Sequence, residues 1–553
     1  MKQIKTDVLV IGGGGAAARA AIAACGAGAS VLMALKGKLG SSGATTYTNC
    51  EIAGYNVPDG AKDPSDNPER FYEDIMNAGM GMADPELARI LTENAEDSFR
   101  DLEEWGLRSE KEGDRYLVMK GCFSTRPRGH IIKGHGEPIM RALIGQIRRR
   151  MDISVMENAA VITLITKDGV CAGAVALDEA GETVFFSAKA VVMATGGASQ
   201  VFPRNLNPPD VTGDGYALAH RAGVKLVNME FMQAGIGFSY PVESLFNTYL
   251  WAGIPKVVNA LGEPFLHKNL PEGLTDRGII REHRRHFPFS SRDHSRYVEI
   301  AVQREIAEGR GTGRGGVPVS FAHFTPDYVD GIRDDSCLRE LWPTVLEHFG
   351  KQGVDLLRDP VEISCYAQAI NGGIRIDENA MSSLPGLFAA GETAGGPHGA
   401  DRLGGNMLLT CQVYGKIAGN AAAAFAKAQR QLPADMPAAE SQSAFAFSIL
   451  RKKANIGELD KKLKTSAQNH LLIRRNEKGL LQLLRDTEAI LSELAAAPAH
   501  DTPERGNMAL LNKITSARLM AKAALLRKES RGSHYREDCP FTDDANYSMQ
   551  ITV

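Results

Sequence analysis

Four consecutive glycines, Gly12 to Gly15, follow directly on a predicted strand, and few folds accommodate such a run at that place. Residues 6–11 (TDVLVI) have the apolar character of a buried strand, and a helical run follows the glycines. The pattern Gly-x-Gly-x-x-Ala between a strand and a helix predicts a βαβ unit that binds a dinucleotide. Gly12 makes the tight turn, Gly14 lets the backbone approach a pyrophosphate, and Ala17 permits close packing of the helix.

A second strand, Ser30 to Leu35, follows at the spacing that a βαβ unit requires. Units of this type usually carry an acidic residue at the end of this strand, where it binds ribose hydroxyls. Here Ala34, Leu35 and Lys36 stand at that place, so the ribose contact must come from elsewhere in the chain. This unit therefore gives no indication of NAD specificity. Lys36 is a candidate contact to the cofactor.

The length and charge of the chain exclude several classes of protein. With 553 residues it is too long for one hydrophobic core, so we expect two to four structural units. Hydrophobic residues make up 43% and charged residues 23%, which excludes disordered, collagenous and disulfide-scaffold proteins. Lys and Arg number 63 against 66 Asp and Glu, and this balance provides no field for binding nucleic acid or an anionic membrane.

The cysteines and the apolar segments predict a cytoplasmic protein without a metal centre. The 8 cysteines lie far apart, and no CxxC, CxxCH or ferredoxin-type run occurs among them. We therefore expect neither an iron–sulfur cluster nor structural zinc in this chain. No secretory signal precedes the first strand, and no apolar stretch reaches the roughly 18 residues that a spanning helix needs.

Three more glycine signatures follow much later in the chain. Residues 191–197 (VVMATGG) predict a strand that ends in a turn, and residues 212–215 (TGDG) open a helix over 216–222. Residues 387–392 (LFAAGE) end a strand with a glycine and an acid, and Gly404-Gly405-Asn406 follows closely. Each alone more often marks a turn than a cofactor contact, but their order is typical of one large group of proteins.

The complete set resembles the flavoprotein family of succinate dehydrogenase, fumarate reductase and L-aspartate oxidase, with adenylylsulfate reductase α chains as more distant members. The resemblance runs nearly from end to end of the chain. Beyond the motifs above it includes residues 372–374 (GGI), 389–409 (AAGETAGGPHGADRLGGNMLL), 473–480 (IRRNEKGL) and 529–540 (ESRGSHYREDCP). The long block around Arg402 is highly specific.

This resemblance implies that the βαβ unit holds FAD rather than NAD. Carried over residue by residue, it assigns the pyrophosphate to Gly12, Gly13, Gly14, Gly15 and Ala16, and it places Ser41, Ser42 and Gly43 near the isoalloxazine. It assigns polar contacts along the cofactor to Asp214 and Glu392, and contacts to the flavin ring to Asn406, Met407 and Leu408. Members with a covalent flavin use a histidine in the segment that corresponds to residues 40–45 (GSSGAT). No histidine occurs in that segment, which predicts non-covalent FAD.

The resemblance also implies hydride transfer between the flavin and a carbon beside a carboxylate, while an arginine moves a proton at the neighbouring carbon. Residues 289–296 (FSSRDHSR) supply two candidates for this arginine. Arg292 fits the family's arginine–aspartate pair best, and Arg296 is its rival. Arg402 corresponds to the arginine that binds a substrate carboxylate, for which a planar guanidinium is well suited.

Two histidines that complete the carboxylate clamp in the family are missing here. The first element reads 233–237 (QAGIG) in this chain, and the second reads Gln368-Ala369. We expect Gly235 to leave more room than a histidine, and Gln368, Gln233 and Tyr249 are candidates for the lost polar contacts. The sequence therefore favours a larger or less charged substrate than fumarate or succinate.

The predicted fold is α/β, with a Rossmann-like FAD-binding domain, an inserted α+β capping domain, a helical domain and a small C-terminal segment. Their predicted ranges are, in that order, 1–223 with 354–425, 224–353, 444–526 and 527–553. Residues 431–442 (QLPADMPAAESQ) are rich in Pro, Ala and polar residues and predict a linker.

These features favour an FAD-dependent oxidoreductase that acts on CH–CH groups, as the reductase of an enoate other than plain fumarate. The electrons must come from outside the chain, and an iron–sulfur electron-transfer subunit is the expected partner in a homo- or hetero-oligomer. Such a partner would place a cytoplasmic chain at the inner membrane face. Three alternatives stay open: amine oxidation as in L-aspartate oxidase, flavin–sulfur chemistry as in adenylylsulfate reductase, and electron transfer without a substrate.

Overall fold

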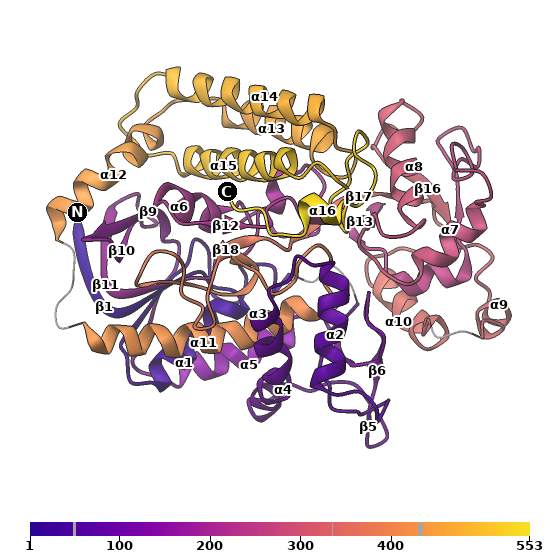
Figure 1. Cartoon of the computed structure of the whole chain (residues 1–553), viewed down its shortest axis with the longest axis horizontal. Helices are drawn as coiled ribbons and strands as arrows, with labels where there is room; N and C mark the ends of the chain where they lie inside the picture. Colours follow the sequence, from indigo (N-terminus) through magenta and orange to yellow (C-terminus); the bar gives the residue numbers. More distant parts are fainter. Residues whose placement is uncertain (48–50, 334–335, 430–434) are drawn as a thin grey trace.

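A mixed sheet of seven strands lies at the centre of the described residues, which are 1–47, 51–333, 336–429 and 435–553 of a computed structural model (Figure 1). Its order is β8-β2-β1-β11-β10-β9, and β19 pairs with residues 191–193 of β11, beyond the stretch that pairs with β10. Strands β8, β2, β1, β11 and β19 run parallel, whereas β10 is antiparallel to both its neighbours. The bounds are β1 (Lys2–Ile11), β2 (Val31–Ala34), β8 (Ile153–Met156), β9 (Ala160–Lys167), β10 (Val170–Leu177), β11 (Thr183–Met193) and β19 (Leu387–Ala389). The predicted first two strands are thereby confirmed as β1 and β2.

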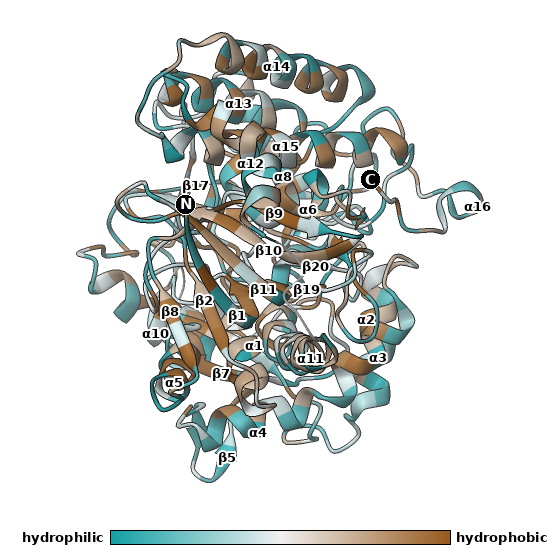
Figure 2. Ribbon diagram, turned by 90° about the vertical axis from the view of Figure 1, so that its left-hand side faces the viewer, coloured by the Kyte–Doolittle hydropathy of each residue, from teal (hydrophilic) through white to brown (hydrophobic). Residues whose placement is uncertain are grey.

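Helices cover both faces of this sheet. One face packs against α1 (Gly15–Gly26), α5 (Glu137–Arg148) and α11 (Asn406–Ala428), and the other lies toward α6 (Asp214–Arg221) and α12 (Met436–Leu450). Figure 2 shows hydrophobic residues concentrated along β1, β2 and β11, between these two helical layers. Because strands β1, β2 and β11 are buried on both faces, they are almost uninterrupted apolar runs.

A second, antiparallel sheet has the order β14-β13-β17-β16-β15 and lies at the right of Figure 1. Its strands are β13 (Met232–Tyr240), β14 (Ser244–Leu245), β15 (Lys256–Val257), β16 (Val317–Ser320) and β17 (Val361–Ile370). The helices around it are η2 (Thr248–Gly253), α7 (Asp276–His283), α8 (Arg296–Ala307), α9 (Pro326–Asp330) and α10 (Leu338–Gly350). Strand β17 pairs with β13 along most of its length. Residues 361–370 therefore share a sheet with the predicted capping domain, 224–353, although the predicted second part of the FAD-binding domain begins at residue 354.

The remaining elements of the first half of the chain lie beside the central sheet. Helices α2 (Pro68–Gly79), α3 (Pro85–Glu93) and α4 (Ala95–Glu104) accompany the sheet β3-β7-β6 and the hairpin β4-β5. These strands are β3 (Ile52–Asn56), β4 (Lys111–Glu112), β5 (Arg115–Tyr116), β6 (Val118–Met119) and β7 (Gly129–Lys133). A small sheet, β12-β18-β20, joins β12 (Leu226–Val227), β18 (Gly373–Arg375) and β20 (Ala394–Gly395), and the short helices are η1 (Ser199–Val201) and η3 (Gly391–Thr393).

The C-terminal part is helical, and the prediction of a linker over 431–442 is wrong for its second half. Helix α12 begins at Met436, where the Asp435 carboxylate accepts from the backbone N–H of Ala438 and Pro437 occupies the first turn. Proline is well tolerated there because the first turn needs no N–H donor. Residues 430–434 lie outside the described residues. The helices that follow are α13 (Ile456–His470), α14 (Glu477–Ala496), α15 (Arg505–Leu526) and α16 (Asp544–Tyr547).

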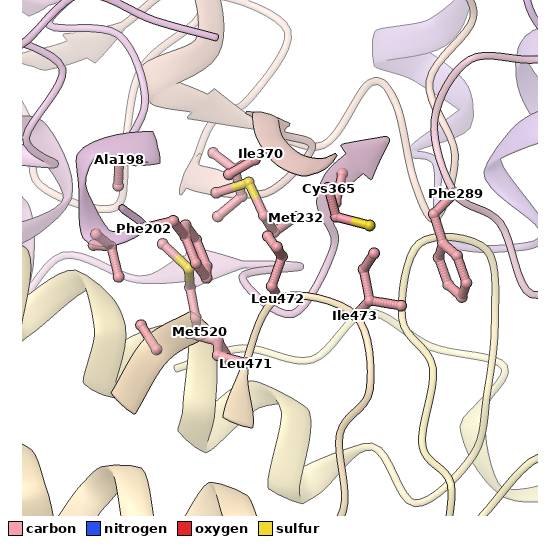
Figure 3. Close-up of a cluster of buried hydrophobic side chains, with 14 of the residues drawn as sticks. Ala198, Phe202, Met232, Phe289, Cys365, Ile370, Leu471, Leu472, Ile473 and Met520 are labelled. Carbon is pink, nitrogen blue, oxygen red and sulfur yellow. The ribbon is translucent and has the colours of Figure 1, made fainter. Parts of the chain in front are cut away.

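An apolar cluster joins this helical part to the two sheets (Figure 3). Leu472 and Ile473, between α13 and α14, point toward Met232 of β13 and Cys365 of β17. Within the described part of the chain no helix is long and apolar enough to cross a membrane.

Candidate functional site

One cavity brings together most of the residues that the sequence singles out. It is lined by Gly12, Gly13, Gly14, Gly15, Ala16, Lys36, Ser42, Gly43, Asp214, Gln368, Glu392, Arg402, Met407 and Leu408. These residues come from the C-terminal ends of β1 and β2, from the start of α6 and α11, and from β17. Four of the candidates, Ser41, Asn406, Arg292 and Arg296, lie outside this lining.

The glycine turn forms one wall of the cavity. Gly12 has a φ of +132°, and a side chain there would lie 2.1 Å from the carbonyl oxygen of Ala194, so only glycine fits. Helix α1 begins after Gly14 without a capping side chain and without an acidic residue in its first turn. A helix N-terminus of this kind attracts an anion through its free N–H groups and its dipole.

The loop that contains Ser42 and Gly43 approaches the glycine turn closely. A methyl group on Gly43 would lie 3.5 Å from the Cα of Gly14. Thr45 in the same loop accepts a hydrogen bond from the N–H of Gly15 through its hydroxyl, at 3.1 Å. The loop therefore closes over the start of α1, and residues 48–50 beyond it lie outside the described residues.

Lys36 and Asp214 face each other across the cavity edge, with 2.6 Å between Nζ and the carboxylate. The carboxylate also accepts from the Thr212 hydroxyl and from the Asn512 amide, each at 2.8 Å. Burial alone would raise the pKa of Asp214, but Lys36 and these two donors together lower it below its usual value. The start of α6 thus brings an ionised carboxylate to the end of β2, where the sequence has no acid.

Glu392 is another acidic group of the lining and differs from Asp214 in its ionisation. Its carboxylate accepts the backbone N–H of Ile370 at 3.0 Å and lies so close to Gly197 that a side chain at 197 would clash with it. Burial raises the pKa of Glu392 to about 7, although the Ile370 N–H and the charge of Arg402 oppose the rise.

Arg402 is a buried guanidinium in the lining of the cavity. Its Nε donates to the side-chain oxygen of Gln233 at 3.1 Å, and its Nη1 donates to the carbonyl of Leu403 at 3.0 Å. Burial lowers its pKa, while the nearby charge of Glu392 raises it. Among the described residues no carboxylate forms an ion pair with this guanidinium, so it is available to an anion in the cavity.

The expectation that Gly235 leaves room beside Arg402 is wrong. A side chain on Gly235 would lie 2.8 Å from the ring of Phe287, and one on Gly237 would lie 2.9 Å from the ring of Tyr366. Residues two apart on a strand share one face, so two aromatic rings cover the two glycines of β13. Phe287 itself lines the cavity.

The two candidate proton-transfer arginines have different surroundings. Arg292 donates through Nε and Nη2 to Asp401 at 2.9 Å and through Nη2 to the carbonyl of Ala78, and its guanidinium stacks on Phe123. Its partner Asp401 is fully buried and precedes Arg402 in the chain. Arg296 instead donates to the carbonyl of Ser291 at 2.6 Å. The structure therefore places Arg292, not Arg296, next to the segment that carries Arg402.

Several lining residues have no motif that could identify them from the sequence. They are Cys122, His135, Leu206, Asn207, Asp210, Leu245, Asn247, Thr248 and Phe287. Two further polar candidates are Gln233 and Tyr249. The side-chain oxygen of Gln233 accepts from Arg402. Tyr249 is buried, and its hydroxyl accepts from the Asn247 amide at 3.2 Å. Both stand outside the lining itself.

Comparison with known families and proteins identifies relatives along the whole chain. The family model described as "FAD binding domain" matches residues 7–408, and the one described as "Fumarate reductase flavoprotein C-term" matches residues 460–553. An uncharacterized FAD-dependent oxidoreductase of Methanocaldococcus jannaschii is 33% identical, over 98% of this chain and 95% of the relative. One subunit of the fumarate reductase (CoM/CoB) of Methanothermobacter marburgensis is 32% identical, over 97% and 95%.

A solved structure gives the same result for the fold. The Mycobacterium smegmatis Sdh1 in complex with UQ1 superposes with a TM-score of 0.84 at 28% identity, covering 100% of this chain and 94% of that one. The expected α/β fold and the FAD cofactor are thereby confirmed.

The cavity fits FAD by its own chemistry. The start of α1, which has no acidic side chain in its first turn, and the close approach of Gly14 and Gly43 suit a pyrophosphate, which needs N–H donors and backbone without side chains. Gly196, with a φ of +75°, has open space where a side chain would be. Asp214 and Glu392 offer oxygen atoms that suit the hydroxyl groups of a sugar or a ribityl chain.

We predict that Gly14→Ala weakens FAD binding at least about tenfold without unfolding the protein. Gly14 has ordinary extended dihedral angles, and the nearest protein atom to an added methyl is 3.7 Å away, so the methyl occupies cavity space. Equilibrium dialysis of the FAD-depleted and refilled protein measures the affinity. Gly26→Ala in the same helix meets no atom within 4 Å and is the matched control. Equal affinities of the two variants would contradict this placement of the cofactor.

We also predict a pH-dependent gain of stability for Glu392→Gln. Between pH 4.5 and about 7 the unfolded chain loses this proton while the folded protein keeps it, so stability falls as the pH rises. Glutamine does not ionise, so the free energy of unfolding of the variant minus that of the parent should increase over this window and then level off. Urea unfolding at several pH values measures it, with the exposed Glu488→Gln as control. If the free energies of unfolding of the variant and the parent differed by the same amount at every pH, Glu392 would already be ionised in the folded protein over this window.

Proposed function

Because the chain belongs to the FAD-dependent flavoprotein family of fumarate reductase and succinate dehydrogenase, we propose that it reduces a carbon–carbon double bond next to a carboxylate held by Arg402. The protein is an FAD-dependent oxidoreductase, and the choice of substrate and direction is the proposal. The observation that carries it is the buried guanidinium of Arg402, which faces the FAD cavity without a carboxylate of the described chain to pair with. A substrate carboxylate supplies that partner.

The residues around Arg402 orient its substrate. Gln233 holds Nε and the carbonyl of Leu403 holds Nη1, which fixes the plane of the guanidinium and leaves its Nη2 side for a carboxylate. Gln368, on the adjacent strand β17, has a buried side-chain oxygen without a hydrogen-bond partner among the described residues. Because Gln368 lines the same cavity, we propose that its amide contacts the substrate. When bound, FAD supplies the hydride that one carbon of the double bond accepts.

Arg292 is the better candidate to deliver the proton that the other carbon accepts. Asp401 and the carbonyl of Ala78 bind its Nε and Nη2, and its Nη1 makes no hydrogen bond within the described chain. Since Arg292 stands outside the cavity lining while its partner Asp401 precedes Arg402, proton delivery requires the Arg292 side chain to turn toward Arg402.

The electrons enter through a partner. A relative named as one subunit of a fumarate reductase supports assembly with at least one further protein, and we propose an iron–sulfur protein in that role in the cytoplasm. The direction of reduction is supported by the predicted non-covalent FAD, since the family couples covalent attachment to succinate oxidation.

The reaction class is tested by reducing the flavin anaerobically and adding candidate oxidants. Rapid reoxidation by 2-enoates, followed by flavin absorbance, supports the proposal. Reoxidation only by iminoaspartate or only by adenylylsulfate would replace it with amine oxidation or sulfur chemistry.

Substitution of the arginines should separate their roles in that assay. We expect Arg402→Gln to lower kcat/KM by roughly 10²–10³-fold through loss of the charged contact. We expect Arg292→Gln to lower kcat by about 10²–10⁴-fold. Arg296→Gln, from the same segment, should stay within about threefold of the parent. A larger loss for Arg296→Gln than for Arg292→Gln would reverse the assignment.

Non-covalent attachment is tested by removal of the cofactor. After acid precipitation we expect all FAD in the supernatant. His135 is a histidine in the cavity lining and is therefore the first position to check by peptide mapping. Flavin that stays on the precipitated chain would contradict this part of the proposal.

A further inference from the structure

An apolar wall lines the part of the cavity beside Arg402. It consists of Leu206, Phe287, Leu245 and Cys122, which pack together with Tyr366 behind them. The first three are hydrocarbon side chains, and the thiol of Cys122 is neutral because burial raises its pKa. The wall therefore offers no charge to a substrate.

The Phe287 ring is held rigidly in this wall. Its backbone N–H donates to the sulfur of Cys122 at 3.0 Å, and the next two residues pair with β13 through a Pro288–Gly235 bridge and a 2.6 Å bond from Phe289 N–H to Ala234. The ring then lies directly over Gly235. These bonds fix the backbone that carries the ring, and the packing against Leu206 and Tyr366 surrounds the ring itself.

The wall and Arg402 line the same cavity and are connected through β13 and through Cys122. Gln233, which binds Arg402, precedes Gly235 by two residues on β13, a step of about 7 Å along a strand. On the other side Cys122 contacts the Arg402 segment, since Gly404 N–H donates to its carbonyl at 3.1 Å. One molecule can therefore touch both.

We propose that the substrate is a 2-enoate with a single carboxylate, bound by Arg402, and an apolar substituent on its β-carbon that packs against the apolar wall. Phe287 is then a specificity-determining residue. This rests on the proposed function. The double bond accepts one hydride and one proton and becomes a single bond, and its two electrons come from reduced FAD, which the electron-transfer partner reduces again.

A second carboxylate on the substrate is disfavoured by the same arrangement. Within the described lining the lysines are Lys36, which is paired with Asp214, and Lys120, which is exposed and has a partner of its own. A carboxylate pressed against Leu206 and Phe287 would lose its hydration without gaining a cation.

Binding to the oxidised holoenzyme tests the proposal without turnover. Isothermal titration calorimetry compares propenoate, (E)-but-2-enoate and fumarate. We expect (E)-but-2-enoate to bind about threefold to tenfold more tightly than propenoate, the effect of burying one methyl group. Fumarate should bind more weakly than either. Tighter binding of fumarate than of (E)-but-2-enoate would overturn the proposal.

The variant Phe287→Ala isolates the wall. It should weaken (E)-but-2-enoate about fivefold and leave propenoate within about twofold. Phe289→Ala is the matched control, because Phe289 is buried in the same segment but does not line the cavity. The ratio of its affinities for (E)-but-2-enoate and propenoate should equal that of the parent. Phe287→Leu serves the same purpose if the alanine variant fails to fold. Equal losses for both acids, or the same change in Phe289→Ala, would show that the ring has only a structural role.

Reoxidation of the reduced flavin separates this inference from the proposed function. Reoxidation by fumarate but by no β-alkyl enoate overturns the inference and leaves enoate reduction standing. Reoxidation by no enoate at all overturns both.

Discussion

The burial of one arginine without an acidic partner determines how this site works. Taking the guanidinium of Arg402 out of water costs free energy, and only neutral groups, the Gln233 amide and the Leu403 carbonyl, bind it directly. The charge of Glu392 is close enough to raise the pKa of Arg402 but is itself reduced by a pKa of about 7. A carboxylate that enters the cavity therefore gains a charged hydrogen bond that the protein lacks.

Glycine serves two opposite purposes around this arginine. At Gly12 it lets one backbone pass another, since a side chain would meet the Ala194 carbonyl at 2.1 Å. At Gly235 and Gly237 the backbone is ordinary strand, and the missing side chains make room for the rings of Phe287 and Tyr366. The first use builds the FAD site, and the second gives the neighbouring cavity an apolar surface. Both uses contribute to the high glycine content of the chain, 57 of 553 residues.

Local motifs predict the βαβ unit, because it depends on neighbouring residues, whereas FAD and the role expected of Arg402 rest on the resemblance along the whole chain. The filling of the space at Gly235 could not be predicted, since Phe287 reaches it from a segment more than fifty residues later in the chain. The carboxylate that lies beside Lys36 at the end of β2 similarly comes from Asp214, far along the chain. The linker predicted over 431–442 is wrong in its second half because, in a sequence, a proline in the first turn of α12 cannot be distinguished from a proline in a linker.

A crystal structure of the oxidised protein with (E)-but-2-enoate tests the central claim most directly. We predict both carboxylate oxygens within about 3.2 Å of the Arg402 guanidinium and the methyl group within about 4.5 Å of the Phe287 ring. A carboxylate bound away from Arg402, or a methyl group directed toward solvent, would contradict the account.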